Sequence, residues 1–459
     1  MRIEPSLWRL AAKNLARNPR RAWATGVSVA LGIAGVLIVS GFIRHLELWL
    51  EVSHIYTQHH GHISVYKRGG LDHFASKPAK YGFTRDEQSR LAAALRTDAA
   101  VERHGFILSG NGLVSNGCRT LSFVALGCAP ELEQWIRSRP ELRAVAPSLS
   151  GIRRGRGPWE RSASPGMLVG MTEFLTTRLG KTRLLSESTP GAPEVPGVLD
   201  CDSPKIVDEL ARDSNVQLLS SAHDGSLAVA DADIAYHFTT GYEELETDAV
   251  QTTLAALQDF YATERVTYLA VFLRSSAQRS GLHEYARALQ ARFTAAGLDV
   301  EVYPFDDPRL SPTLAGGSQF LGALGNASLA IMLLLVGITL SNSVALAASE
   351  LSREFAVLRA VGYRSNQVVD LQVRETILAV SIACIGGIGL ATAAALALNA
   401  AHVETRLPGL WGTQPLCIEV DALTSAGIVV AFMLVSVAAC YWASWRLMRR
   451  PPLELLAAS

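Results

Sequence analysis

The sequence predicts a helical membrane protein with four transmembrane spans and a large α+β domain between the first and second spans. Three observations predict this class. Four long apolar runs contain no charged side chain, the region between the first two runs mixes strand-like and helix-like patterns, and only 18% of the 459 residues are charged. Soluble domains contain about 25% charged residues, so the deficit fits a chain with membrane segments.

Each apolar run is long enough to cross a bilayer, because a helical span needs about 20 apolar residues. A soluble chain rarely contains four such runs, which argues against buried core helices. In chain order the predicted segments are an N-terminal helix (1–21), the first span with a stalk (22–46), the outer domain (47–318), the second span (319–348), a loop with a short helix (349–376), the third span (377–401), a short loop (402–421), the fourth span (422–445) and a tail (446–459).

Basic residues in the flanks predict the orientation of the spans. Lys and Arg crowd the segment before the first span, the 349–376 loop and the tail, whereas the 402–421 loop has only Arg406. Because cytoplasmic loops carry the excess of Lys and Arg, both termini and the 349–376 loop are predicted to be cytoplasmic. The domain at 47–318 is then predicted to lie outside the membrane.

Several function classes are disfavoured by what the sequence lacks. No Asp, Glu, Lys, Arg or His lies within a span, and ion-driven transporters usually bury such groups. The formal net charge is zero, so no basic field favours nucleic acid. The Gly180-Lys181-Thr182 sequence resembles the end of a P-loop, but Leu175 stands where that loop needs glycine. No catalytic pattern is present, so the chain is not expected to be an enzyme.

The outer region contains recognisable helix and strand signals. Thr84 and Glu87 form a capping box that opens a helix running through Leu95. The other predicted elements are a strand in HISVYK (62–67), a hairpin of Ile107–Val114 and Arg119–Leu126 around Ser115-Asn116-Gly117, a helix at Asp248–Thr263, and a strand, a helix and a strand at Val266–Leu273, Ser276–Ala296 and Leu298–Tyr303. The domain is therefore α+β.

Small residues recur in two of the spans, at Ala24, Ser28 and Gly32 and at Gly386, Gly387, Gly389 and Ala393. Such stripes let helix backbones approach closely. They fit either packing within one chain or a dimer interface.

Histidines and cysteines are candidates for metal or redox chemistry. Four histidines cluster, at positions 54, 59, 60 and 62, but adjacent histidines on a strand point to opposite faces and no carboxylate lies at a ligand-like spacing nearby. The pattern favours surface histidines and no metal site. Cys118 and Cys128 flank a predicted strand and are a candidate pair for a disulfide.

The loop between the second and third spans is the most informative segment. Residues 350–364 read ELSREFAVLRAVGYR. Its apolar positions fall at i, i+4 and i+7 on one helical face, and they are Leu351, Phe355 and Leu358. Its charged positions on other faces are Glu350, Arg353 and Glu354. Gly362 ends the pattern as a C-cap would. The pattern predicts a short amphipathic helix on the cytoplasmic side.

This loop, in the sequence ELSREFAVLRAVGYRSNQVVDLQVRE, closely resembles the corresponding loop of the FtsX/MacB/LolE-type permeases of ABC transporters. The positions that carry the resemblance are Arg353, Glu354, Leu358, Arg359, Ala360, Gly362 and Glu375. LAAKNLARNPRRAW resembles the family's N-terminal helix along the membrane, and ASWRLMRRPPLELL resembles its closing segment, with Pro451-Pro452 where the family usually has Asp-Pro. HHGHISVYKRG resembles a strand of the lipoprotein-release branch, LolC/LolE-like, which is favoured.

The resemblance implies a mechanism of the type VII, mechanotransmission kind. Two permease chains, either two copies or two paralogues, pair above two ATPase subunits, which hold ATP and Mg, so that no cofactor binds this chain. The residues implied to contact the ATPase are Glu350, Leu351, Arg353, Glu354, Phe355, Leu358, Arg359 and Gly362. A lipoprotein or lipid from the outer leaflet of the inner membrane is the implied substrate, with an acyl route near Leu46, Trp49 and Phe320.

Two other functions stay open. A MacB-like exporter of small molecules or peptides would need a periplasmic adaptor. An FtsX-like permease would instead signal to an extracytoplasmic hydrolase.

Overall fold

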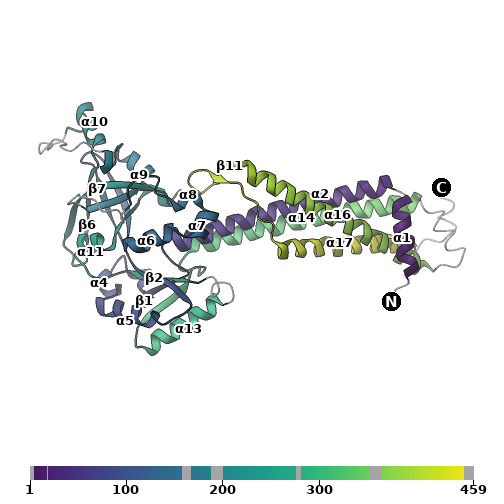
Figure 1. The fold of residues 1–459 in the computed structure, drawn as a ribbon, viewed down its shortest axis with the longest axis horizontal. Coiled ribbons are helices and arrows are strands. Elements are labelled where there is room, and N and C mark those ends of the chain that lie inside the picture. Colours follow the sequence, from purple (N-terminus) through teal and green to yellow (C-terminus); the bar gives the residue numbers. More distant parts are fainter. Residues whose placement is uncertain are drawn as a thin grey trace. The chain divides into compact units, whose positions relative to one another are not determined.

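The computed structural model describes residues 5–17, 19–157, 167–187, 200–274, 281–350 and 364–448. The chain forms two compact units. One, the membrane unit, comprises residues 1–47, 318–405 and 415–459, and the other, the extramembrane unit, comprises residues 48–317 and 406–414. Figure 1 labels their helices and strands.

The membrane unit consists of long helices. Among the described residues, four helices are long and apolar enough to cross a membrane, which confirms the predicted class. They are α2 (Pro19–Val52), α14 (Pro312–Glu350), α16 (Ser365–Ala401) and α17 (Ala422–Met448). The preceding α1 (Pro5–Arg17) crosses the end of this bundle (Figure 1). Both α2 and α14 run without interruption across the division between the two units.

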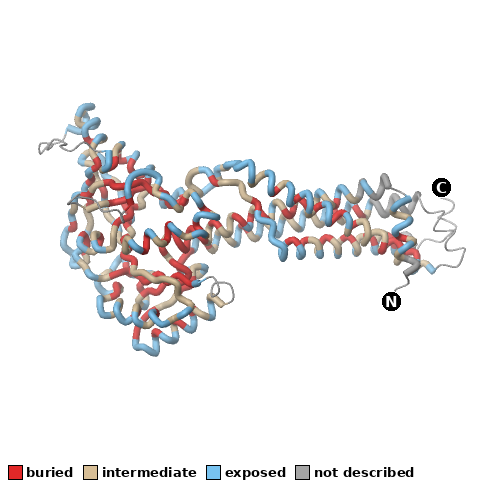
Figure 2. The backbone as a smooth tube through the Cα atoms, in the orientation of Figure 1, coloured by how far each residue is buried: buried red, intermediate tan, exposed pale blue. Residues whose placement is uncertain are grey.

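Small residues let the membrane helices pack closely within one chain. A Cβ atom on Gly32 would lie 3.1 Å from Val336, and one on Gly387 would lie 2.8 Å from the carbonyl oxygen of Ala30. By contrast, a Cβ on Gly389 would meet nothing within 4 Å. Figure 2 shows buried residues along the inner sides of these helices and exposed ones along the outer sides. Part of the glycine stripe therefore serves contacts inside the chain.

The extramembrane unit is built on a ten-stranded mixed sheet. Its strands are β1 (Ile63–Lys67), β2 (Val101–Ser115), β3 (Thr120–Cys128), β4 (Arg154–Gly155), β5 (Met167–Thr172), β6 (Asn215–Ser221), β7 (Leu227–Phe238), β8 (Ala249–Thr253), β9 (Tyr268–Leu273) and β10 (Val300–Pro304). The strand order is β10-β1-β9-β2-β3-β8-β5-β7-β4, and β6 pairs with both β2 and β7. This double pairing closes six strands into a ring, in the order β2-β3-β8-β5-β7-β6.

Helices cover the sheet and fill its connections. They are α3 (Gly70–His73), α4 (Pro78–Tyr81), α5 (Arg85–Leu95), α6 (Pro130–Arg137), α7 (Pro140–Val145), α8 (Pro147–Ser150), α9 (Glu173–Arg178), α10 (Pro204–Arg212), α11 (Leu254–Phe260) and α13 (Leu282–Ala295). Short turns of other helix types are η1 (Ser53–Thr57), η2 (Leu185–Glu187) and η3 (Leu245–Thr247), and a small two-stranded sheet joins β11 (Glu404–Thr405) to β12 (Gln414–Pro415).

Alternation along the strands divides the core into separate clusters. In β9, Leu269 and Val271 face α5 and α13, whereas Tyr268 and Phe272 face the opposite side, where Trp49 also packs. This is the two-residue period expected of a strand buried on both faces. Inside the closed ring, a third cluster forms around residues such as Phe123 and Val250.

Most predicted elements of this unit are confirmed, with one correction. The capping box of Thr84 and Glu87 is present and opens α5. The predicted helix at 248–263 is wrong over its first part, because β8 occupies 249–253 and pairs in parallel with β3. The β-branched residues Val250, Thr252 and Thr253 favour a strand there, and the helix α11 begins only at Leu254.

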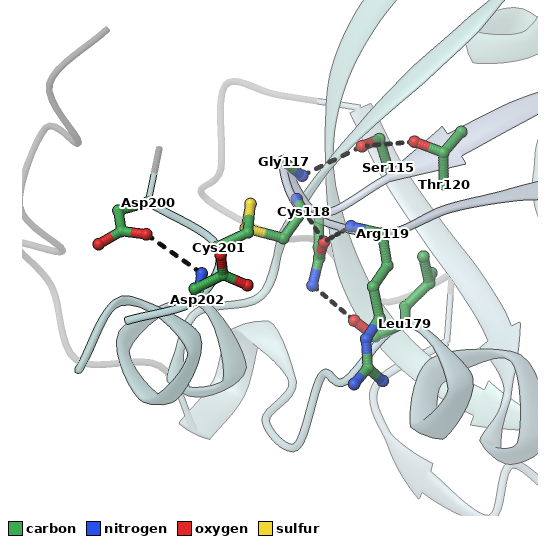
Figure 3. The surroundings of a disulfide bond; sticks show 10 residues. Ser115, Gly117, Cys118, Arg119, Thr120, Leu179, Asp200, Cys201 and Asp202 are labelled. Carbon is green, nitrogen blue, oxygen red and sulfur yellow. Dashed lines mark hydrogen bonds between the residues drawn. A yellow bond between two sulfur atoms is a disulfide. The ribbon is translucent and has the colours of Figure 1, made fainter. Parts of the chain in front are cut away.

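The disulfide of the domain differs from the predicted pair. Cys118 bonds to Cys201, 83 positions away, and Cys128 is a buried free thiol. Cys118 lies at the tip of the β2–β3 hairpin, where Asn116 Oδ1 accepts hydrogen bonds from the backbone N–H groups of Cys118 and Arg119 (Figure 3). Cys128 is the last residue of β3, and a strand rises about 3.3 Å per residue, so the nine residues of β3 place Cys128 roughly 25 Å or more from the hairpin tip, beyond the reach of a disulfide.

Candidate functional site

The base of the membrane unit is held together by side chains from α1 and α16. Asn14 Nδ2 donates a hydrogen bond of 2.7 Å to Glu375 Oε1, and the Arg374 guanidinium lies 5.2 Å from the centroid of the Trp8 ring. Arg374 is buried and also binds Asp370 Oδ2 at 2.8 Å. We call Trp8, Asn14, Arg374 and Glu375 the base clamp. It fixes the N-terminal helix against the start of α16.

A second set of contacts joins α16 to α17 at the same level. Thr376 Oγ1 donates to Cys440 Sγ at 3.0 Å, and Ser444 Oγ donates to Gln372 Oε1 at 3.3 Å. The helix α16 begins at Ser365, well before the apolar run that starts at Ile377. Its first turns therefore connect the predicted cytoplasmic loop directly to the third span as one helix.

The predicted ATPase-contacting residues lie almost entirely outside the described residues. Glu350 is the last residue of α14, and its side chain is not described; the positions from Leu351 to Gly362 fall in the gap that ends at Arg364. The first residue of the base clamp after this gap is Arg374, about three turns into α16. Sequence reasoning singled out Glu375 through the family resemblance but missed Asn14 and Trp8, because an isolated Asn or Trp on an amphipathic helix carries no signal of its own.

The histidine cluster is buried in the extramembrane unit, which corrects the prediction of surface histidines. His54, His59 and His62 are buried and His60 is partly buried. The chain turns sharply here, since His59 and Gly61 both adopt positive φ values, of 62° and 67°. A Cβ at Gly61 would lie 2.8 Å from the carbonyl oxygen of Val271, so only glycine fits.

A carboxylate that lies far away in the sequence approaches this turn. His59 Nε2 lies 2.5 Å from Glu133 Oε2 on α6, and Cys128 Sγ lies 3.7 Å from the same oxygen. Arg137 Nε donates to the other oxygen, Oε1, at 2.6 Å, and Arg137 also donates to the side-chain oxygen of Gln251 at 3.1 Å. We call this the His59–Glu133–Arg137 network.

The three potential metal ligands of this network fit a hydrogen-bond network better than a metal ion. Within the described part of the chain, His59, Cys128 and Glu133 form a group of ligand atoms that lie within 4.8 Å of one another. Zinc uses these donor types. Arg137, however, occupies one carboxylate oxygen, and its positive charge opposes a cation beside Glu133. The other oxygen accepts hydrogen bonds from His59 and Cys128, so the carboxylate is already satisfied.

Electrostatics in this region separates charged from neutral groups. Burial by itself would raise the pKa of Glu133, but Arg137 and His59 hold that pKa well below its usual range. Burial lowers the pKa of His62 to about 4, and Arg139 contributes to this shift. Burial also holds the pKa of His60 well below its usual value, with smaller contributions from His54 and His59. Glu133 is therefore ionised at neutral pH, and His60 and His62 are neutral.

A column of stacked rings leads away from the turn. The ring centroids of His54 and His60 are 4.4 Å apart, those of His60 and Tyr268 5.6 Å, and those of Tyr268 and Tyr66 5.0 Å. His54 and His60 also line a cavity of about 580 Å³ together with the 242–247 and 310–314 segments.

The three predicted substrate residues lie in different surroundings. Trp49 is fully buried in the extramembrane core, with its ring 5.5 Å from that of Tyr242. Leu46 is partly buried, and Phe320 is exposed over 68% of its surface. A substrate role for these residues stays a prediction.

Part of the membrane unit matches a known protein family. Residues 326–452 match the family described as FtsX-like permease C-terminal. The match runs from the middle of α14 through α16 and α17. It includes both the predicted ATPase-contacting segment and the half of the base clamp that lies on α16. No curated protein matches the sequence.

Two solved structures are similar to part of the chain at low identity. The periplasmic region of MacB from Actinobacillus actinomycetemcomitans is 8% identical, with a TM-score of 0.31, and the match covers 53% of this chain and 88% of that one. The extracellular domain of the noncanonical ABC-type transporter YknZ from Gram-positive bacteria is 11% identical, with a TM-score of 0.29, and the match covers 52% and 98%. Because both scores are low, the family resemblance rests on the match over residues 326–452.

Proposed function

We propose that this chain, which belongs to the FtsX-like permease family by residues 326–452, is the membrane subunit of an ATP-driven transporter whose ATPase is a separate protein. ATP and Mg would bind that ATPase. A second permease chain, either a copy or a paralogue, would complete the complex. Both termini would lie in the cytoplasm, and the extramembrane unit would lie in the periplasm, outside the inner membrane.

The base clamp is the observation that supports this proposal best. A membrane subunit driven from the cytoplasm needs a rigid connection between the segment that the ATPase moves and the spans. The helix α16 follows the 350–362 segment closely, and Asn14–Glu375 and Trp8–Arg374 attach it to α1. A displacement of that segment would therefore move α1 and α16 together.

The helix α2 then supplies the route outward. It runs from Pro19 to Val52. The short helix η1 follows it and leads to the turn that the His59–Glu133–Arg137 network holds. An α-helix rises 1.5 Å per residue, so a helix of 34 residues extends about 50 Å. This helix is the proposed route for motion from the membrane unit toward the extramembrane unit.

A lipoprotein or another lipidic molecule, extracted from the outer leaflet, is the proposed substrate. Phe320 supports this choice, because its ring is largely exposed on a membrane helix where an acyl chain could contact it. Trp49 is buried, so an acyl chain could contact it only if the extramembrane core opened. There are two alternative functions. One is efflux with a periplasmic adaptor, and the other is signalling to an extracytoplasmic hydrolase.

The test is co-purification of the tagged full chain in mild detergent, followed by mass spectrometry of the bound proteins and lipids. A P-loop ATPase together with a lipoprotein is the expected result. An adaptor or a cell-wall hydrolase in its place would assign the chain to one of the other two functions.

A Phe355→Asp variant tests the coupling segment, with Phe355→Leu as the matched control. Burying apolar side chains in a groove contributes about 25 cal/mol per Å², and a charge at position 355 would remove that contribution. We expect Asp to abolish ATPase binding and Leu to preserve it, with equal membrane insertion. Equal recovery of the ATPase with the Asp variant would refute the role of this segment.

A further inference from the structure

An apolar groove of about 640 Å³ lies between α1, α2 and α16 in the membrane unit. Apolar side chains and glycines alone line it. They include Ala12 and Leu15 from α1, Trp23 and Gly26 from α2, and Ile382 and Gly386 from α16. Trp23 and Ile382 are exposed over 72% and 63% of their surfaces, so the groove opens to the side of the unit.

The groove has the length and direction of part of an acyl chain. Its lining residues extend from Trp23 to Ala30 along α2 and from Leu378 to Gly386 along α16. At 1.5 Å per residue, these stretches run for roughly 10 to 12 Å parallel to the spans. The helix α1 crosses the end of the bundle (Figure 1), and its residues Ala12, Leu15 and Ala16 line the groove.

A row of positive charges lies on α1 beside the groove. Arg9, Lys13 and Arg17 follow one another at intervals of four along α1, and all three are exposed. Lys13 and Arg17 directly follow the groove residues Ala12 and Ala16, so the row lies about 100° around the helix from the groove. No ion pair is recorded for the three among the described residues, and α1 contains no acidic residue.

The site is preformed, because the base clamp fixes α1. Asn14 and Trp8 hold the helix against α16 through Glu375 and Arg374. A ligand would therefore bind between surfaces that are already in position, and it would not have to order a loose helix.

We propose that the groove and the basic row together bind one anionic phospholipid, which goes beyond the transport function proposed above. One acyl chain lies in the groove along α2 and α16, and the phosphate lies on the row formed by Arg9, Lys13 and Arg17. Lys and Arg near a membrane surface attract anionic headgroups. The charge beside the groove favours this occupant over an apolar span of a second copy, because no Asp or Glu lies within the four spans.

The experiment uses the full chain, reconstituted in vesicles of phosphatidylcholine with or without phosphatidylglycerol, then extracted and examined by native mass spectrometry. We expect retained phosphatidylglycerol in the wild-type chain, with a preference over phosphatidylcholine of roughly tenfold or more, because several basic side chains act together. The preference should decline at high salt, since exposed charges are screened.

Two sets of variants separate the groove from the charges. Gly26→Leu should fill the groove without a clash, because a Cβ on Gly26 would meet nothing within 4 Å. Gly35→Leu is its matched control, since Gly35 is on the same helix, is equally free of neighbours within 4 Å, and does not line the groove. The Arg9→Gln/Lys13→Gln/Arg17→Gln variant removes the charges and keeps the groove.

Gly26→Leu should lose the retained lipid, Gly35→Leu should keep it, and the triple variant should lose only the preference for phosphatidylglycerol. Equal retention of both lipids by the wild-type chain would overturn the proposal, and so would undiminished retention by Gly26→Leu. If Gly26→Leu instead changed the number of chains per complex and left lipid retention unchanged, the groove would belong to a second copy and the proposal would fail.

Discussion

His59 and Glu133 are 74 positions apart in the sequence, and their side chains meet at 2.5 Å inside the extramembrane unit. Arg137 binds the other carboxylate oxygen at 2.6 Å. The contact ties the turn that follows η1 to α6, so a buried carboxylate anchors the first turn of the extramembrane unit.

Glu133→Gln should destabilise the extramembrane unit by about 3 to 5 kcal/mol, because it leaves the buried Arg137 guanidinium without a counter-charge. The free energy of unfolding of the full chain in detergent, followed by tryptophan fluorescence in urea, measures this. The double variant Glu133→Gln/Arg137→Met should recover part of the loss.

The matched control is Glu264→Gln, which removes the partner of Arg85 in a pair whose side chains are 73% and 79% exposed. Exposed pairs contribute about 0 to 1 kcal/mol, so this variant should unfold almost like the wild type. Similar losses in the buried and exposed variants would contradict the importance of the network.

Acid should destabilise the extramembrane unit through its buried neutral histidines. The pKa of His62 is lowered to about 4 in the folded chain, from an ordinary value of 6.5. When the pKa of a histidine is lower in the folded chain, the unfolded chain takes up the proton first as the pH falls. The contribution of that histidine to the free energy of unfolding is therefore complete above pH 6.5 and declines as the pH falls toward 4. Between pH 7.5 and pH 5, His62 alone should account for about 2 kcal/mol.

His60→Phe tests the pH effect with a matched shape. Burial also lowers the pKa of His60, and its Nδ1 atom has no hydrogen-bond partner, so phenylalanine keeps the ring stack and removes a titrating group. Unfolding at pH 7.5 and pH 5 should show a smaller loss for His60→Phe than for the wild type. An unchanged or larger loss would show that His60 does not contribute.

Removal of the Cys118–Cys201 bond should cost about 2 to 4 kcal/mol, because the bond closes a long loop in the unfolded chain. The change is Cys118→Ala/Cys201→Ala, and denaturant unfolding measures it. Cys417→Ala, which removes a free thiol, is the control. If reducing agent lowered the stability of the double variant as much as that of the wild type, the loss would not come from this bond.

Asn14→Ala should weaken the base clamp. The hydrogen bond to Glu375 is made to a charged group, and such bonds contribute about 1.5 to 3 kcal/mol. We expect a lower unfolding free energy for the membrane unit in detergent titration, and a lower rate of ATP hydrolysis in the complex with the ATPase still bound. Asn366→Ala, at an exposed position of α16, should leave both unchanged; equal effects would argue against the clamp.

The membrane spans could be predicted from sequence because their signal is local. A run of apolar residues such as that in α17 specifies a span without reference to any other part of the chain. The capping box at Thr84 and Glu87 was predictable for the same reason, since both partners lie within one turn. These elements needed no knowledge of the tertiary fold.

The features that sequence reasoning missed depend on contacts between distant positions. Cys118 finds Cys201 only when the hairpin tip approaches the segment before α10, and His59 finds Glu133 only when α6 packs under the turn. The strand at 249–253 forms because β3 offers it a parallel partner. No local sequence pattern predicts these three contacts, because each forms only when distant segments pack together in the folded domain.

The redox state of the Cys118–Cys201 pair also reports the compartment that contains the extramembrane unit. Thiols are oxidised to disulfides in the periplasm and stay reduced in the cytosol. Acid quenching of whole cells, followed by denaturation, alkylation with a heavy maleimide and electrophoresis, would therefore distinguish an exported domain, with both sulfurs protected, from a retained one, with two additional labels. The relative intensities of the two bands would give the fractions of exported and retained chains.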